Sequence, residues 1–110
     1  MKPTAKSKQI PLTQPGQHLR EAMEDWGLSQ YQLAKGLGVQ QTRIMEILKG
    51  RRAITADTAL RLARFFDTSE EFWLQLQMNY DIAKARRRLG ARVKKEIEPV
   101  MSKQWNRDSV

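Results

Sequence analysis

The side chains best suited to molecular recognition lie in one short segment, QQTRIMEILKGRR, from Gln40 to Arg52. Its apolar residues recur at helical spacing, at Ile44, Ile47 and Leu48, so it predicts an amphipathic helix over about 40–49. The opposite face carries amides, a hydroxyl and charges, which are the groups that hydrogen-bond to base edges and phosphates. The alternative is an ordinary surface helix whose polar face is solvated.

Catalytic and metal chemistry are poorly represented in the sequence. The chain has no Cys and one His, His18, which has no neighbouring metal-ligand type. It also lacks a Gly-rich phosphate loop and a pair of carboxylates placed for acid–base work. We therefore expect no enzymatic activity, no cofactor and no metal.

Two other classes are also disfavoured. No apolar run approaches the ~18 residues needed to span a bilayer, and the polar start lacks the apolar centre of a signal peptide. We therefore expect a cytoplasmic protein with no membrane partner, associated with the nucleoid when it binds DNA. RNA recognition would need exposed rings, whereas the aromatic residues follow helical stripes and are expected in the core: Trp26, Phe65, Phe66, Phe72 and Trp73.

The net charge of +8 is unevenly distributed. Residues 1–15 carry three Lys and no acid, and residues 83–110 carry nine basic and three acidic groups. The middle, 16–82, has eight basic and nine acidic residues, yet its segment 27–55 holds five cations against Glu46 alone. The basic zone of the middle therefore includes the 40–52 segment.

The expected elements are all helical, because no segment alternates with period two. Ser29 and Gln32 form a capping box, Gly38 suits a turn, and Thr68 with Glu71 suggests a second box. The predicted helices cover 16–26, 30–36, 40–49, 56–66 and 69–88. We divide the chain into a flexible arm (1–14), a helix-turn-helix and dimerisation domain (15–88) and a basic, partly disordered tail (89–110).

The last predicted helix carries two apolar stripes. One suits the core, and the other, about 200° away, is formed by Leu74, Met78 and Ile82. A second stripe in so small a protein needs a partner surface, and a second copy of the chain is the simplest. The alternative is that one of the chain's own arms covers it. The run KARRR at 84–88 could contact phosphate, bind an acidic partner or solubilise the helix end.

The two short central helices have helix-turn-helix spacing. A small residue, Ala34, is followed four residues on by Gly38 and then by Ile44 and Ile47. With PGQHLRE at 15–21, GLSQYQLAKGLGV at 27–39, TRIMEILKGRRAITADTALRLARFF at 42–66 and TSEEFWLQLQMNYD at 68–81, the chain resembles the lambda-repressor-like (Cro/cI, XRE-type) family and, within it, the HigA-type antitoxins.

The resemblance implies a five-helix lambda-repressor-like fold and a dimeric repressor of its own operon. It also implies an inverted-repeat operator in double-stranded DNA and a RelE-like, HigB-like partner toxin that cleaves mRNA. The alternative is a stand-alone XRE-type regulator with no toxin. Gln40, Gln41 and Met45 depart from the residues common in the family, so the operator sequence does not carry over.

The recognition segment then yields specific candidates. We predict that base edges are read by Gln40, Gln41, Thr42, Met45, Glu46 and Lys49. Phosphates are assigned to Gln30, Lys35, Arg43, Arg51 and Arg52. Two alternatives stay open: the glutamines could instead satisfy free backbone N–H groups of the first turn, and Glu46 could instead pair with Lys49 or Arg43.

Overall fold

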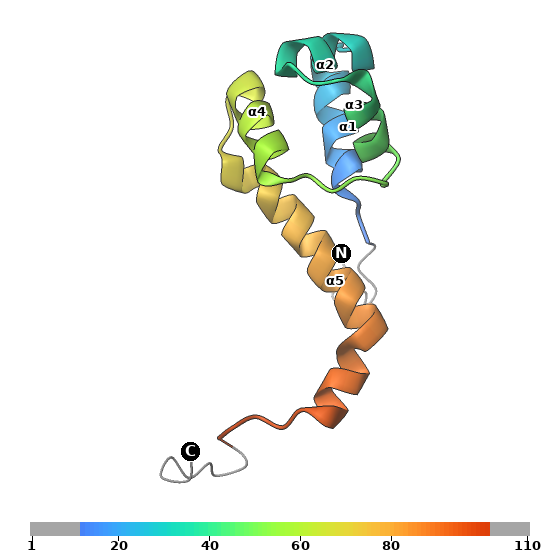
Figure 1. Ribbon diagram of the computed structural model, residues 1–110, viewed down its shortest axis with the longest axis vertical. Coiled ribbons are helices and arrows are strands. Elements are labelled where there is room, and N and C mark those ends of the chain that lie inside the picture. Colours follow the sequence, from blue (N-terminus) through green and yellow to red (C-terminus); the bar gives the residue numbers. More distant parts are fainter. Residues whose placement is uncertain (1–11, 102–110) are drawn as a thin grey trace, which may run out of the picture.

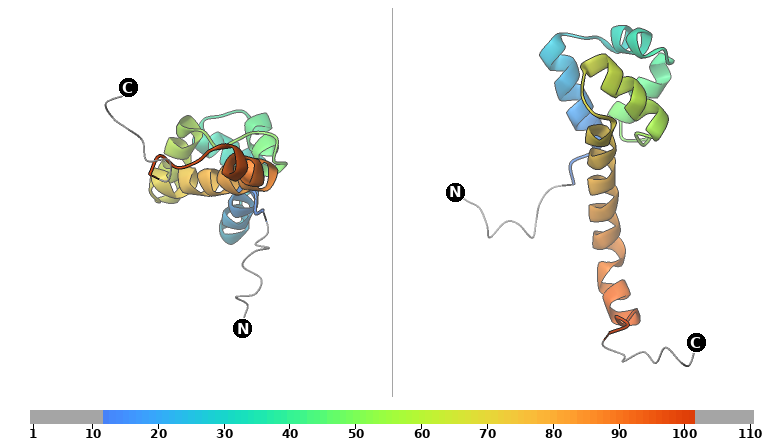
Figure 2. Two further views of the ribbon diagram at one scale, coloured as in Figure 1. Left: turned by 90° about the horizontal axis from the view of Figure 1, so that it is seen from below. Right: turned by 90° about the vertical axis from the view of Figure 1, so that its left-hand side faces the viewer.

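The computed structural model describes residues 12–101, and every regular element in that range is an α-helix. The helices are α1 (Pro15–Trp26), α2 (Gln30–Leu37), α3 (Gln41–Leu48), α4 (Ala56–Phe66) and α5 (Glu70–Glu96). The first four gather at one end of the molecule, and α5 runs from α4 past this body and continues beyond it (Figure 1). The side view in Figure 2 shows the same arrangement, a compact head on a long helical stem. This confirms the predicted all-α class.

The helix starts follow the predicted capping signals. The Ser29 hydroxyl accepts a hydrogen bond from the Gln32 backbone N–H at 3.0 Å, and the Gln32 side chain accepts one from the Ser29 N–H at 2.9 Å. Both halves of the capping box are therefore present. At the other end of α2, Gly38 adopts a left-handed φ of 71°, which lets the chain turn directly into α3.

The start of α5 differs from its prediction by one residue. Ser69, not Thr68, is the N-cap, and its hydroxyl accepts from the Phe72 N–H at 3.0 Å. The Thr68 hydroxyl instead accepts a 2.8 Å hydrogen bond from the indole N–H of Trp73. The predicted second capping box is therefore wrong, because Thr68 is needed to satisfy a buried indole.

The end of α5 also differs, because the helix continues to Glu96 rather than ending near 88. Residues 89–96 contain no proline, and Gly90 weakens a helix by only ~1 kcal/mol; the proline that stops it is Pro99. The boundary predicted between the domain and its tail thus falls inside α5. Residues 1–11 of the arm and 102–110 of the tail lie outside the described part of the chain.

The core is formed where α1 to α4 meet the first turns of α5. It contains the predicted apolar residues of the motif, and its largest fully buried side chains are Trp73, Leu19, Leu33, Ile44, Ile47 and Leu62. The prediction that five aromatic residues lie in the core is right for Trp73 and Phe66 and wrong for the other three. Trp26 is 71% exposed, Phe72 46% and Phe65 39%. No helix in the range 12–101 is long and apolar enough to cross a membrane.

Candidate nucleic-acid interface

The helix-turn-helix is built by α2 and α3 packing directly on each other. Ala34 is buried where the helices cross, and Ile44 and Ile47 anchor the inner face of α3 with 0% and 1% exposure. The prediction that these residues fill the space between the two helices is confirmed. The inner face therefore leaves the opposite face of α3 directed to solvent.

The outer face of α3 holds the predicted base-reading residues. Gln40, Gln41, Thr42 and Lys49 are exposed, whereas Met45 and Glu46 are half-buried. Gln40 is the N-cap of α3, but its side chain makes no capping hydrogen bond. The alternative role, in which this amide satisfies backbone N–H groups, is therefore not realised, and the amide remains available to a partner.

Glu46 pairs with Arg52 rather than with Lys49 or Arg43. Its carboxylate accepts from the Arg52 guanidinium at 2.8 Å (Nε) and 2.7 Å (Nη2). Both alternative pairings along the helix are therefore wrong. The loop after α3 turns back and brings Arg52, which is six residues further along the chain, to the Glu46 carboxylate. This pair places a positive charge beside the Glu46 carboxylate, and it also engages Arg52, a predicted phosphate contact.

Arg43, another predicted phosphate contact, joins α3 to α4. Its Nη1 donates to Asp57 Oδ1 at 2.9 Å and to the buried Thr58 hydroxyl at 3.3 Å. The same Asp57 oxygen accepts from Arg61 Nε at 2.7 Å. Hydrogen bonds from Arg61 and then Arg43 hold the pKa of the Asp57 carboxyl below its ordinary value.

Arg61 extends this bridge to the turn of the motif. Its Nη1 donates to the backbone carbonyl of Leu37 at 2.9 Å and more weakly to that of Gly38 at 3.4 Å. The Asp57 cluster therefore fixes the end of α2, the start of α3 and α4 relative to one another. The sequence indicates only a helix-dipole role for Asp57, because fourteen residues separate it from Arg43.

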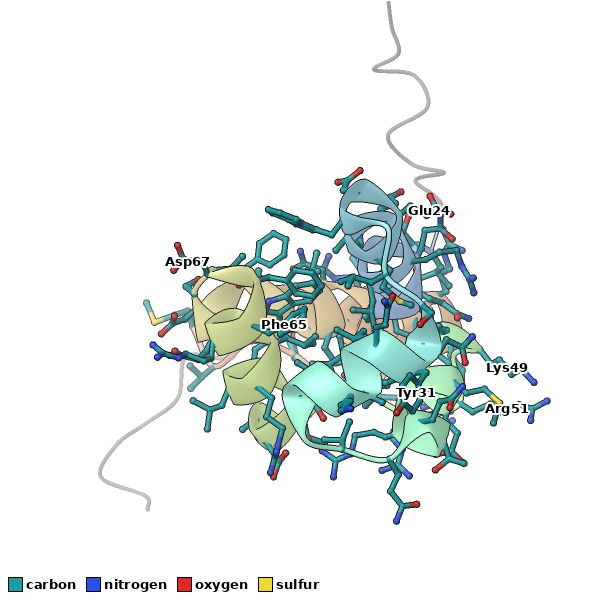
Figure 3. All side chains as sticks on the ribbon, turned by 90° about the horizontal axis from the view of Figure 1, so that it is seen from above. Glu24, Tyr31, Lys49, Arg51, Phe65 and Asp67 are labelled. Carbon is teal, nitrogen blue, oxygen red and sulfur yellow. The ribbon has the colours of Figure 1, made fainter. Side chains whose placement is uncertain are left out.

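The remaining predicted phosphate contacts surround the reading face. Lys49 and Arg51 are exposed and project from the same side of the molecule, just beyond α3 (Figure 3). Lys35 lies over the Tyr31 ring, with 5.9 Å from its Nζ to the ring centroid. Gln30 is the first residue of α2, where its backbone N–H has no partner within the helix.

The loop after α3 also meets α5. Arg51 and Arg52 line a hollow of about 180 Å³ together with Lys84, the first residue of the KARRR run. The loop is held there by a 2.7 Å hydrogen bond from the Ile54 N–H to the Gln77 side chain. A cation of the run thus lies beside the loop that carries two predicted phosphate contacts, an arrangement that no local sequence signal indicates.

The predicted dimer stripe lies on the outer side of α5. Met78 and Ile82 are 47% and 41% exposed, whereas Leu74 is half-buried and packs against the core. Because α5 is longer than predicted, Val93, also 47% exposed, continues the apolar side beyond Ile82. The three stripe residues stay a prediction, with Leu74 shared between the core and any partner.

Comparison with known proteins supports the motif and the whole fold. The HTH_3 helix-turn-helix family model matches residues 19–73. Antitoxin HigA-1 of Vibrio cholerae is 31% identical over 84 residues, which is 76% of this chain and 78% of that protein.

Solved structures agree over more of the chain. An addiction module antidote protein of the HigA family from Coxiella burnetii superposes with a TM-score of 0.80 at 46% identity, covering 82% of this chain and 99% of that one. The Pseudomonas aeruginosa antitoxin HigA, solved with the higBA promoter, has a TM-score of 0.79 at 38% identity, with 82% and 99% covered. With its capped α2, its left-handed Gly38 turn and its exposed α3 face, the chain belongs to the XRE-type (HTH_3) helix-turn-helix family and, within it, to the HigA-type antitoxins.

Proposed function

We propose that this protein is a dimeric, sequence-specific DNA-binding antitoxin that represses its own operon and neutralises a HigB-like, mRNA-cleaving toxin. The observation that carries the proposal is the outer face of α3, which presents exposed amides beside exposed cations on a helix whose inner face is buried in the core. A recognition helix in the major groove needs this combination, with amides for adenine edges and cations for phosphates.

Within this face, the free Gln40 side chain and its neighbour Gln41 are proposed to enter the groove first, at the N-terminal end of α3. Thr42 and Met45 offer methyl groups to thymine. Lys49 and Arg51, at the far end, contact phosphate. Each good bidentate base contact is worth about 1–3 kcal/mol of discrimination.

Two of the predicted phosphate contacts take on a second role. Arg43 and Arg52 are held by Asp57 and Glu46, respectively. Each of these arginines can therefore contact a phosphate only if it divides its hydrogen bonds between the phosphate and the carboxylate, or leaves the carboxylate. We propose that Lys35, Lys49 and Arg51 carry most of the phosphate affinity, because no described ion pair engages them.

A dimer follows from the exposed outer side of α5. Packing this side against its copy would bury Met78 and Ile82 and present two α3 helices to one DNA duplex. Two such helices bind half-sites about one helical turn, ~34 Å, apart. The DNA-bound relative from Pseudomonas aeruginosa supports the DNA-binding part of the proposal. As a DNA-binding repressor, the protein is expected in the cytoplasm, associated with the nucleoid.

The direct test uses the full chain and the DNA upstream of its own gene. Footprinting should protect an inverted repeat with this spacing. The small protein encoded by the adjacent gene should inhibit growth when it is expressed alone, and co-expression of the present protein should restore growth. Protection without rescue would leave a stand-alone regulator. Binding that is indifferent to DNA sequence would contradict the proposal as a whole.

A further inference from the structure

The most unusual surface outside the DNA-reading face is an aromatic hollow between the ends of α1 and α4. It has a volume of about 250 Å³ and is lined by Trp26, Leu28, Phe65, Phe66 and Asp67. We call it the aromatic slot. Phe65 and Asp67 lie on the opposite side of the molecule from Lys49 and Arg51, so the slot is remote from the reading face (Figure 3).

The slot walls are held in place by packing and by backbone hydrogen bonds. Phe65 meets Phe66 edge-on with 5.1 Å between ring centroids, and Phe66 is in turn 5.8 Å from the buried Trp73. On the other side, the Leu28 N–H donates to the Met23 carbonyl at 2.8 Å, which fixes the turn that carries Trp26. The slot is therefore preformed.

This arrangement leaves large apolar groups partly exposed to water. Trp26 is 71% exposed and Phe65 39%. Fixed, partly exposed aromatic rings around a hollow are typical of the anchor points of protein interfaces, where Trp and Arg contribute most of the binding energy. The slot therefore has the character of a docking site.

Asp67 determines which side chain fits. It lines the slot, and no ion pair among residues 12–101 includes it. Its φ of 58° is left-handed, a conformation that a glycine would adopt more easily, as Gly27 and Gly38 do at the ends of α1 and α2. The chain thus keeps a carboxylate here at a cost to its backbone.

We propose that the aromatic slot receives an arginine or lysine side chain of a protein partner. The stem or guanidinium plane would lie against the Trp26 and Phe65 rings, and the charged end would pair with Asp67. A purely apolar side chain would cover the carboxylate without pairing it, and an acidic one would be repelled. A cationic side chain satisfies both the rings and the acid, and its bond to the carboxylate is the stronger, charge-assisted kind.

The identity of the partner rests on the proposed function. A toxin that cleaves mRNA needs cationic side chains to hold the RNA backbone. An antitoxin that binds one of these cations in the slot both anchors the toxin and removes a group the toxin needs for its substrate. Because the slot is remote from α3, the toxin and the operator could be held at the same time.

The chemistry of the slot can be tested with a small probe and the full chain. Nα-acetyl-arginine amide should produce a saturable NMR shift of the Trp26 indole N–H signal. That signal is assigned by its absence from the spectrum of the Trp26→Phe variant. The neutral isostere Nα-acetyl-citrulline amide should bind at least three-fold more weakly. No saturable shift at Trp26, or an equal response to both probes, would overturn the inference.

Variants separate the carboxylate from the fold. Asp67→Asn keeps a residue that tolerates left-handed φ and should weaken the arginine probe at least three-fold. Asp67→Gly should weaken it as much while raising the melting temperature. Tyr31→Ala, which removes a ring of 60% exposure on α2, is the matched control and should bind as the wild type does.

The toxin itself gives the second readout. Asp67→Asn and Trp26→Ala should each weaken the complex with the neighbouring small protein at least ten-fold and leave operator binding unchanged. If the wild type and Asp67→Asn bind it equally, the slot inference fails while the proposed function stands. If that protein does not bind the wild type, the toxin function fails and the arginine titration still decides the slot. A monomeric Trp26→Ala variant would assign the slot to the dimer interface and overturn the inference.

Discussion

Gly16 is the position where one added methyl group should do the most damage. It lies at the start of α1, where the end of α3 crosses it closely. A Cβ built on Gly16 would collide with the backbone carbonyl oxygen of Ile47 and would lie 3.0 Å from the Leu48 Cα. Because both obstacles are backbone atoms, no side-chain rotation can relieve the contact, and α1 must move away from α3.

The expected magnitude is the difference between two opposing effects. Replacing glycine by alanine in an open helix stabilises it by up to ~1 kcal/mol, whereas overpacking a close contact costs about 1–3 kcal/mol. We expect Gly16→Ala to destabilise the fold by about 1–2 kcal/mol, which lowers Tm by roughly 4–15 °C in a domain of this size. Operator binding should also weaken at temperatures where the variant is folded, because α1 would no longer support α3, the proposed recognition helix, in its present position.

Gly90→Ala is the matched control for this experiment. Gly90 lies inside α5, and a Cβ built on it would have its nearest neighbour 3.9 Å away, the Cβ of Arg86 in the same helix. The same chemical change should therefore raise stability by up to ~1 kcal/mol. Urea unfolding of both variants at one protein concentration measures the contrast. A Gly16→Ala variant as stable as Gly90→Ala, with unchanged operator affinity, would refute the close-approach argument.

Other perturbations address the caps, the Asp57 cluster, the dimer and the phosphate contacts. Ser29→Ala should lose ~1 kcal/mol in urea unfolding because it removes the cap of α2; an unchanged midpoint would contradict this. The pKa of Asp57 is lower in the folded chain than its ordinary value. The Asp57 interactions therefore contribute their full stabilisation at any pH above the ordinary pKa, and they lose it as the pH falls through the lowered pKa of the folded state. Asp57→Asn should therefore be less stable at neutral pH and lose less stability in acid; parallel pH profiles would exclude this linkage. Ile82→Glu should yield a monomer by analytical ultracentrifugation, and a persisting dimer would place the interface elsewhere. Arg51→Ala should weaken all duplexes alike and make the slope of log K against log salt shallower by about 0.9, the amount that one neutralised phosphate contributes; an unchanged slope would remove Arg51 from the phosphate contacts.

Local signals in the sequence are sufficient for the motif itself. Helix caps and turns depend on residues three or four positions apart, so the Ser29 box and the Gly38 turn can be predicted directly. The anchoring of α3 by Ile44 and Ile47 follows from periodicity alone. These features determine where the reading face lies, and hence most of the functional interpretation.

Contacts between distant segments cannot be predicted in the same way. Asp57 has a plausible local role at the start of α4, and nothing in the sequence shows that Arg43 and Arg61 converge on it. Glu46 has local partners at helical spacing, yet the loop after α3 brings Arg52 to its carboxylate instead. In both cases a local interpretation exists, and the path of the chain between helices decides against it.

The ends of helices are the other source of error. Trp26 continues the apolar stripe of α1 by spacing, yet it is 71% exposed at the last residue of that helix. The predicted end of α5 is too early because residues beyond 88 offer little apolar surface to bury, yet the helix continues to Glu96 with Val93 still 47% exposed. Periodicity predicts which side of a helix is apolar but not how far its neighbours extend along it.

The most direct test of the central claim is a binding selection on random duplexes with the wild type, Gln41→Ala and Arg51→Ala. If the protein is a dimer that reads DNA with its two α3 helices, the wild type should enrich an inverted repeat with half-sites about one helical turn apart. Gln41→Ala should lose base preference at one symmetric pair of positions, and Arg51→Ala should keep the same repeat with lower affinity. An unenriched pool, or a Gln41→Ala preference identical to that of the wild type, would contradict the assignment of α3 as the reading helix.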